Sequence, residues 1–271
     1  MEGNTDYAEL VIPPSIPPDK TPDLLKYWYL GSRARRYISR RRLTAVTDAV
    51  PPAPGQLVLD VGCGAGLALA LLRRRGFRPV GIDLVDDGFY AARRIGEANG
   101  LEFKLSRADA SRLPFRPSTF RAVTAVEVLE HIFEGDRRRA LAEMARVISS
   151  GGALVLSTPN YGSLVETGKR LFNKSRLLRR LLPFMHYPTP NVDRTTYHPH
   201  RYHLPVPPSS LRTLIKDAGF TVVGTKKFLF TLKYTPDGLF RMVKWFERFL
   251  ERLPLVRELA CTVLIVAVKT G

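Results

Sequence analysis

A glycine-rich turn between an apolar segment and a helical one constrains the fold of this chain more than any other feature. Glycines occupy positions 62, 64 and 66, directly after the apolar run Leu57-Val58-Leu59 and directly before a helical pattern that begins near Leu67. Glycines permit a tight turn from a strand into a helix, and they let a ligand lie against the backbone amides of the turn. The feature therefore favours an α/β sheet with a ligand at the end of its first strand.

The rest of the chain alternates between strand-like and helix-like patterns. Strands are predicted at residues 56–61, 79–83, 102–106, 120–126, 153–157, 220–232 and 261–268, and helices at 66–75, 87–99, 137–148, 209–218 and 236–253. Strands that alternate with helices form a mostly parallel sheet, because right-handed crossovers carry each helix back over the sheet. The predicted fold is α/β, a Rossmann-like, seven-stranded, mostly parallel sheet with helices on both faces.

Two stretches lie outside this alternation of strands and helices: an N-terminal extension and an insertion in the main domain. Residues 1–46 are predicted to form an extended arm and a basic helical extension, because five prolines crowd the first half and seven cations the second half. This basic helix is expected to be paired or broken around Gly31. Residues 47–271 form the main domain, in which a basic, proline-containing insertion at 160–208, after the fifth strand, is expected to be a substrate lid or a membrane-contacting segment.

Charge and cysteine content limit the partners and the compartment. The 42 Lys and Arg residues against 25 Asp and Glu give a net charge of +17, which suggests a polyanionic partner, either a nucleic acid or an anionic membrane surface. Two isolated cysteines fit a reducing, cytoplasmic setting, and the N-terminus does not resemble a signal peptide. The longest apolar run, 261–268, is far shorter than the roughly 20 residues needed to cross a bilayer, so any membrane contact is expected to be peripheral.

Three aspartates follow the first three predicted strands. Asp60 closes the first strand, Asp83 closes the second, and Asp109 follows the third. A carboxylate at Asp83 can accept hydrogen bonds from both hydroxyls of a ribose, which occurs in NAD-binding proteins as well. Leu67 stands where the dinucleotide fingerprint requires a third glycine, and an acid at Asp60 suits a cationic amino-acid moiety better than a pyrophosphate. The pattern therefore favours a sulfonium cofactor over a dinucleotide.

From about residue 57 to residue 160 the chain resembles class I methyltransferases, in particular methyltransferase type 11 and the ubiquinone-biosynthesis O-methyltransferases. The resemblance implies S-adenosylmethionine as the cofactor. The residues expected to contact it are Asp60, Gly62, Gly64 and Gly66 around the methionine moiety, Asp83 at the ribose and Asp109 at the adenine. Further cofactor contacts are expected from Cys63, Leu84, Ala110 and Glu127. One departure is Arg121, where the family often has an aspartate, and it is expected to affect a surface turn.

The fourth predicted strand ends in Glu127-Val-Leu-Glu130-His131, at the edge where the ligands of open α/β sheets gather. This segment resembles one in ubiquinone-type O-methyltransferases. A similar Glu-x-x-Glu-His, joined by a later histidine, holds a divalent metal in small-RNA 2′-O-methyltransferases, and His198, His200 and His203 follow here. We expect His131 or His203 to help deprotonate the acceptor, directly or through Mg²⁺ or another divalent metal. The expected metal ligands are Glu127, Glu130, His131 and His200. In the alternative, no metal binds and these side chains contact the cofactor region, cap a helix or pack in a loop.

The basic insertion carries an amphipathic pattern. Between residues 164 and 185, apolar residues recur beside six cations and one acid, which is typical of a helix lying on an anionic bilayer. The quinone-biosynthesis methyltransferases that the chain resembles have a membrane-contacting segment at this place. The alternative is an active-site cover whose cations are solvated. The predicted helix at 236–253 either extends the same surface or packs on the sheet.

The expected acceptor is an amphiphilic small molecule, such as a prenylated phenol or a lipid-linked sugar, methylated at a membrane surface on oxygen or, in the alternative, on nitrogen or carbon. A nucleic acid competes for the same charge, since arginines between Arg33 and Arg42 could contact phosphates while Tyr27, Trp28 and Tyr29 stack on bases. Against it, phosphate binding does not require the apolar stripe of the insertion. The alternative function is a metal-dependent RNA 2′-O-methyltransferase. A third, a non-catalytic protein that binds S-adenosylmethionine, would need a damaged glycine loop, and this loop is intact.

Overall fold

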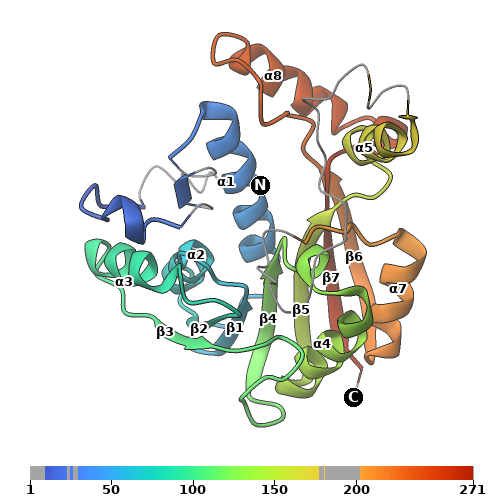
Figure 1. Cartoon of the computed structure of the whole chain (residues 1–271). Helices are drawn as coiled ribbons and strands as arrows, with labels where there is room; N and C mark the ends of the chain where they lie inside the picture. The colour runs from blue at the N-terminus through green and yellow to red at the C-terminus, as the bar shows by residue number, and fades with distance from the viewer. Residues whose placement is uncertain (1–9, 23–24, 27–29, 177–179, 181–201, 271) are drawn as a thin grey trace.

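Seven strands form one sheet in the order β3-β2-β1-β4-β5-β7-β6. The computed structural model describes residues 10–22, 25–26, 30–176, 180 and 202–270. The strands are β1 Leu57–Val61, β2 Arg78–Asp83, β3 Lys104–Arg107, β4 Phe120–Val126, β5 Ile148–Pro159, β6 Phe220–Phe228 and β7 Thr262–Lys269. Neighbouring strands from β3 to β5 are parallel, and β7 is antiparallel to both β5 and β6. The predicted seven-stranded, mostly parallel α/β sheet is confirmed (Figure 1).

Helices cover both faces of this sheet. One face carries α1 (Arg33–Ala49), α2 (Leu67–Arg74) and α3 (Phe89–Ala98), and the other carries α4 (Glu134–Val147) and α7 (Pro208–Asp217) (Figure 1). Successive residues of a strand point to opposite faces, so Val58 packs in the core beneath α1 and α2 while Leu59 packs in the core beneath α4 and α7. Both are fully buried, which explains why β1 is continuously apolar rather than alternating.

Further helices lie away from the two covering layers. They are α5 (Leu164–Lys174), α8 (Phe240–Leu250) and α9 (Pro254–Arg257), together with the short 3₁₀ helices η2 (Pro18–Lys20) and η4 (Leu129–His131). Figure 1 shows α8 and α5 at the top of the molecule, beyond the strands and far from the C-terminus. In the part of the chain that the structure describes, no helix combines the length and the apolar character needed to cross a membrane.

The strand after α4 begins earlier than predicted. β5 starts at Ile148, immediately after α4 ends, whereas the sequence pattern placed its start at residue 153. Gly151 and Gly152 therefore lie inside the strand and do not end the helix. A Cβ at Gly152 would lie 2.7 Å from the carbonyl oxygen of Arg121, so glycine is required where the two strands approach and their register shifts between Phe120 and Ala122.

The N-terminal extension packs on the main domain. α1 begins at Arg33, two residues beyond Gly31, with Ser32 as its N-cap, and it runs past the predicted boundary at residue 46. Its buried side chains Ile38 and Val46 join the core beneath the sheet. The arm before it is anchored as well, because the backbone of Val11 exchanges two hydrogen bonds with the Asn99 side chain at the end of α3.

The basic insertion is described over its first part. α5 covers Leu164–Lys174, and Ser163 caps it by accepting a hydrogen bond from the backbone N–H of Glu166. The helix predicted over residues 164–185 is interrupted, because α5 ends at Lys174 and Ser175 has an extended backbone. Residues 177–179 and 181–201 lie outside the described part of the chain.

Candidate active site

A cavity of about 770 Å³ opens where β1, β2 and β4 end. Its walls come from the glycine loop, from the residues after β2, β3 and β4, from η4, from α1 and from His203. The volume lies within the range of sites that bind cofactor-sized molecules, and the location is the edge where open α/β sheets bind their ligands.

The glycine loop forms the floor of the cavity. Gly62 has a φ of +72°, and a Cβ there would lie 2.5 Å from Cγ2 of Val128, so the turn excludes a side chain. Gly64 has a φ of +46°, and a Cβ there would meet nothing within 4 Å. Its backbone N–H donates a hydrogen bond to Oδ2 of Asp83 at 2.9 Å. The loop backbone is therefore open to a ligand at Gly64 and closely packed at Gly62.

Asp60 lies beneath this loop and is almost completely buried. Its Oδ1 accepts a hydrogen bond of 2.7 Å from the hydroxyl of Thr124. Burial raises the pKa of Asp60 to about 7, opposed by the Thr124 hydrogen bond and assisted by the charge of Asp83. A positively charged ligand would favour the ionised form, which is compatible with the ammonium group expected at this position.

Most of the other predicted cofactor residues line the same cavity. They are Gly62, Cys63, Gly64, Asp83, Leu84, Asp109, Ala110 and Glu127. Burial raises the pKa of the Cys63 thiol, and a Cβ added at Gly81 would lie 2.8 Å from its sulfur, so the thiol packs over β2. Gly66 differs from the rest, because it begins α2 with a φ of +74°, and a Cβ there would lie 3.0 Å from Cβ of Ala92. Gly66 therefore permits α2 and α3 to pack together.

Glu127 lies at the end of β4 and faces α1. Its backbone has a φ of +55°, an uncommon conformation for a residue with a side chain. Its Oε2 forms an ion pair with Arg42 Nη1 at 3.1 Å, while its buried Oε1 has no hydrogen-bond partner. Burial raises the pKa of Glu127, and the charge of Arg42 opposes this shift.

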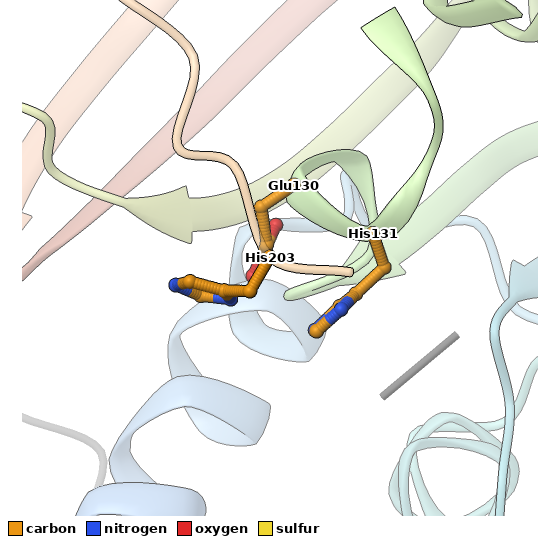
Figure 2. A group of neighbouring side chains, drawn as sticks. All are labelled: Glu130, His131 and His203. Carbon is orange, nitrogen blue, oxygen red and sulfur yellow. The ribbon is translucent and has the colours of Figure 1, made fainter. Parts of the chain in front are cut away.

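Glu130, His131 and His203 come together beside Glu127. One ligand atom from each of the three lies within 4.8 Å of the others, and Figure 2 shows the first two on η4 and the third on the chain segment that approaches it. Glu130 is buried, and its Oε2 accepts a hydrogen bond of 3.0 Å from the Thr158 hydroxyl. Burial, followed by the charge of Glu127, raises the pKa of Glu130 well above its usual value.

Backbone contacts position His203 against η4. The N–H of Leu204 donates to the carbonyl oxygen of Glu130 at 2.9 Å. Nδ1 of His131 lies 2.6 Å from the carbonyl oxygen of Tyr202. Because a carbonyl only accepts, Nδ1 carries a proton, and in the neutral imidazole Nε2 then carries the lone pair. Burial and the neighbouring His131 lower the pKa of His203 to about 3, so this imidazole is neutral at physiological pH.

Arg137 on α4 holds the same two segments together. Its buried guanidinium donates to the carbonyl oxygens of Leu129 and Ile132, at 3.1 and 3.0 Å, and to that of Leu204 at 2.5 Å. These bonds satisfy a charge that would otherwise be costly to bury. They also fix the distance between η4 and the segment that carries His203.

The structure partly regroups the residues predicted for catalysis and metal binding. His203 joins Glu130 and His131, whereas Glu127 is not a member of that cluster and pairs with Arg42. His200 and His198 lie outside the described residues. The sequence reasoning missed the α1 wall, namely Ser39, Arg42 and Leu43. Their spacing of i, i+3 and i+4 places them on one helix face, and this spacing could have predicted the wall. The many cations of the same segment indicated a solvent-exposed helix instead.

Comparison with known proteins gives the family. Residues 59–156 match the family model described as a methyltransferase domain. The chain is 34% identical over 189 residues to a demethylmenaquinone methyltransferase of Thermus thermophilus, an alignment that covers 68% of this chain and 82% of that protein. This chain belongs to the S-adenosylmethionine-dependent methyltransferases. It is also 37% identical over 108 residues to a ubiquinone biosynthesis O-methyltransferase of Hahella chejuensis, covering 40% of this chain and 44% of that protein.

The fold comparison agrees with this membership. A phosphoethanolamine N-methyltransferase of Haemonchus contortus, solved in complex with S-adenosylmethionine, matches with a TM-score of 0.55 and 16% identity over 85% of this chain and 53% of that one. This likeness supports the fold. The methyltransferase cavity described above provides an open loop backbone at Gly64 and carboxylates at Asp60, Asp83 and Asp109, which suits a cofactor with an ammonium group, ribose hydroxyls and an adenine amine.

Proposed function

We propose that this methyltransferase methylates a hydroxyl oxygen of an amphiphilic small molecule, such as a prenylated phenol or a lipid-linked sugar. The observation that carries the proposal is the cluster of Glu130, His131 and His203 in the same cavity as the glycine loop. A hydroxyl is a weak nucleophile until its proton is removed, so an O-methyltransferase needs a group that handles that proton. One relative is named a ubiquinone biosynthesis O-methyltransferase, which supports methylation on oxygen.

The cluster is suited to activating a hydroxyl. S-adenosylmethionine supplies the electrophilic methyl group. His131 presents Nε2 as a proton acceptor, because its Nδ1 proton is held by the carbonyl oxygen of Tyr202. A divalent metal held by Glu130, His131 and His203 would lower the pKa of a coordinated hydroxyl. The neutral imidazole of His203 and the buried carboxylate of Glu130 fit such an ion, since imidazole and carboxylate are ligands of divalent metals.

The walls around the cluster favour an acceptor with an apolar part. Leu25 and Leu43 line the cavity on one side, and Val128, Ile132 and Phe133 line it from the η4 region. An aromatic ring or the first part of a prenyl chain would remove these surfaces from water. A membrane is the expected source of such a molecule, and the exposed Leu164 and Leu171 of α5 are consistent with contact there.

An RNA 2′-O-methyltransferase would use the same Glu and His cluster. Two of the arginines expected to contact phosphates are committed elsewhere, because Arg41 pairs with Glu251 at 2.8 Å and Arg42 with Glu127 at 3.1 Å. Their charges are balanced within the protein, which reduces the phosphate-binding surface of α1. This observation favours the small-molecule acceptor.

The test is transfer of label from methyl-labelled S-adenosylmethionine to a prenylated catechol dispersed in detergent, with a short RNA as the competing acceptor. We expect label on the catechol oxygen, loss of transfer in His203→Asn, and little change in Glu134→Gln, an exposed acid near the cluster. Chelation should stop transfer, and Mg²⁺, Mn²⁺ or Zn²⁺ should restore it. Label on RNA alone would reject the proposed acceptor. Transfer that resists the chelator but still requires His131 would show that His131 removes the hydroxyl proton of the acceptor without a metal.

A further inference from the structure

α8 buries a carboxylate on its inner side, where Phe240 also packs against Tyr37, and it exposes most of its large apolar side chains. Glu247 in this helix is 1% exposed, whereas Trp245, two residues earlier, is 71% exposed. Surface helices of globular proteins show the opposite arrangement, with apolar side chains toward the core. The orientation therefore requires a specific cause.

Two carboxylates on the inner side of α8 fix this orientation. Glu247 accepts hydrogen bonds from the Tyr37 hydroxyl at 2.6 Å and from the backbone N–H and hydroxyl of Thr231 at 2.6 and 2.5 Å. Glu251, at the end of the helix, accepts from Arg41 at 2.8 Å and from the N–H of Leu229 at 2.9 Å. Turning the helix to bury its aromatic residues would leave these buried donors without partners, which is costly. The outward apolar side is thus built into the fold.

The outward side of α8 carries a row of exposed apolar residues. Met242, Trp245, Phe246 and Phe249 follow the spacing i, i+3, i+4 and i+7, so they share one helix face, and all four are exposed. Leu255 of α9, at 87% exposure, follows them along the chain. We call these five residues the α8 apolar face. Soluble proteins rarely expose such a contiguous surface unless it meets a partner.

The charges beside the α8 apolar face indicate the partner. Arg241 and Arg248, seven residues apart, are exposed and follow one edge of the face, while the acid within α8, Glu247, is buried on the other side. An apolar strip edged by cations, with a tryptophan next to the charged edge, has the composition of a helix lying in the headgroup region of an anionic bilayer. We propose that α8 and α9 dock this methyltransferase on an anionic lipid surface through the α8 apolar face.

α1 connects this face to the cavity. Tyr37 and Arg41 hold α8 from one side of α1, while Ser39, Arg42 and Leu43 line the cavity from the same helix. Docking would therefore place the lipid surface one helix away from the site that takes the acceptor. In this respect the inference rests on the proposed function, because it identifies the anionic bilayer as the surface from which an amphiphilic acceptor enters.

The test uses Trp245 as its own reporter. The sequence has two tryptophans, so Trp28→Phe leaves one. We expect vesicles of phosphatidylcholine with phosphatidylglycerol, but not phosphatidylcholine alone, to shift Trp245 emission to the blue and to allow quenching by bromine-labelled lipid, with weaker binding at high salt. Met242→Ser/Phe246→Ser/Phe249→Ser should weaken vesicle binding at least tenfold. Val223→Ser, which removes an equally exposed apolar side chain on β6, should not.

Three outcomes would overturn the inference. The first is a Trp245 emission that does not change when anionic vesicles are added, and the second is vesicle binding by the triple variant that equals the binding by the parent protein. The third is a protein that does not bind vesicles but forms a concentration-dependent dimer, which the triple variant abolishes. Binding of S-adenosylhomocysteine by the triple variant verifies that it is folded. Methyl transfer to a detergent-dispersed catechol separates the two proposals, because transfer without vesicle binding rejects only the docking surface, and vesicle binding without transfer rejects only the acceptor.

Discussion

Replacing Asp60 with asparagine is expected to remove a pH dependence from cofactor binding. Asp60 is buried beneath the glycine loop, and burial raises its pKa to about 7. Below that pH the folded protein without cofactor holds Asp60 mostly neutral. The ammonium group of the cofactor interacts favourably with the ionised carboxylate, so binding must release the proton. The affinity therefore rises as the pH increases through the pKa of the free site.

The size of this effect follows from the pKa. With a pKa of about 7, the ionised fraction of Asp60 is roughly 0.1 at pH 6 and roughly 0.9 at pH 8. If only the ionised form binds tightly, the affinity increases about tenfold between these two pH values, which corresponds to about 1.4 kcal/mol. At pH 7 about half a proton is released for each cofactor molecule bound.

Isothermal titration with S-adenosylhomocysteine measures both quantities. Titrations at pH 6, 7 and 8 give the affinity, and titrations in two buffers of different ionisation enthalpy give the number of protons released. Asp60→Asn should bind more weakly at pH 8 and show no change between pH 6 and 8, whereas Asp109→Asn should lose affinity and keep the wild-type slope. A wild-type affinity that is independent of pH, or the same slope in Asp60→Asn, would refute the assignment of the proton to Asp60.

Two further predictions concern residues that act through packing. Arg137→Met removes the hydrogen bonds that hold η4 to the segment carrying His203. It should reduce methyl transfer about a hundredfold, which is the effect of a shift of about 1 Å in the reacting groups, and leave the affinity for S-adenosylhomocysteine unchanged. Equal losses of transfer and affinity would indicate general unfolding. Gly62→Ala should lower the free energy of unfolding by about 2–4 kcal/mol, because it combines a left-handed backbone with a contact to Val128. Gly55 has a φ of +78° and no atom within 4 Å of an added Cβ, so Gly55→Ala should lose only the stability that comes from the left-handed backbone. Equal destabilisation of the two variants in thermal or urea unfolding would contradict this account.

The sequence predicted the cofactor half of the molecule because its signals are local. The glycine loop, Asp60 and Asp83 lie within one strand-turn-helix-strand unit, so their spacing along the chain specifies their placement in space. The end of α4 was predicted to within one residue, but the start of β5 was harder to locate, since paired glycines such as Gly151 and Gly152 usually lie outside strands and here permit close strand pairing. That role depends on β4, which precedes these glycines in sequence and contacts them only in the fold.

The acceptor side was less predictable because its contacts are distant in sequence. His203 reaches Glu130 and His131 through backbone bonds that span about seventy residues, and Arg42 reaches Glu127 from a helix outside the recognised motifs. The amphipathic pattern of α8 was visible, but it does not state which side faces the core. The partners of Glu247 and Glu251, which come from α1 and from the segment after β6, determine that the side carrying Trp245, Phe246 and Phe249 faces outward.

A crystal structure with S-adenosylhomocysteine tests the central claim most directly, because that claim places the cofactor and the Glu130, His131 and His203 cluster in one cavity. The account predicts the ribose hydroxyls at Asp83, the adenine beside Asp109, the amino group near Asp60, and the sulfur atom facing the cluster. A cofactor product bound with its sulfur turned away from Glu130, His131 and His203, or bound outside the cavity that the glycine loop lines, would contradict it.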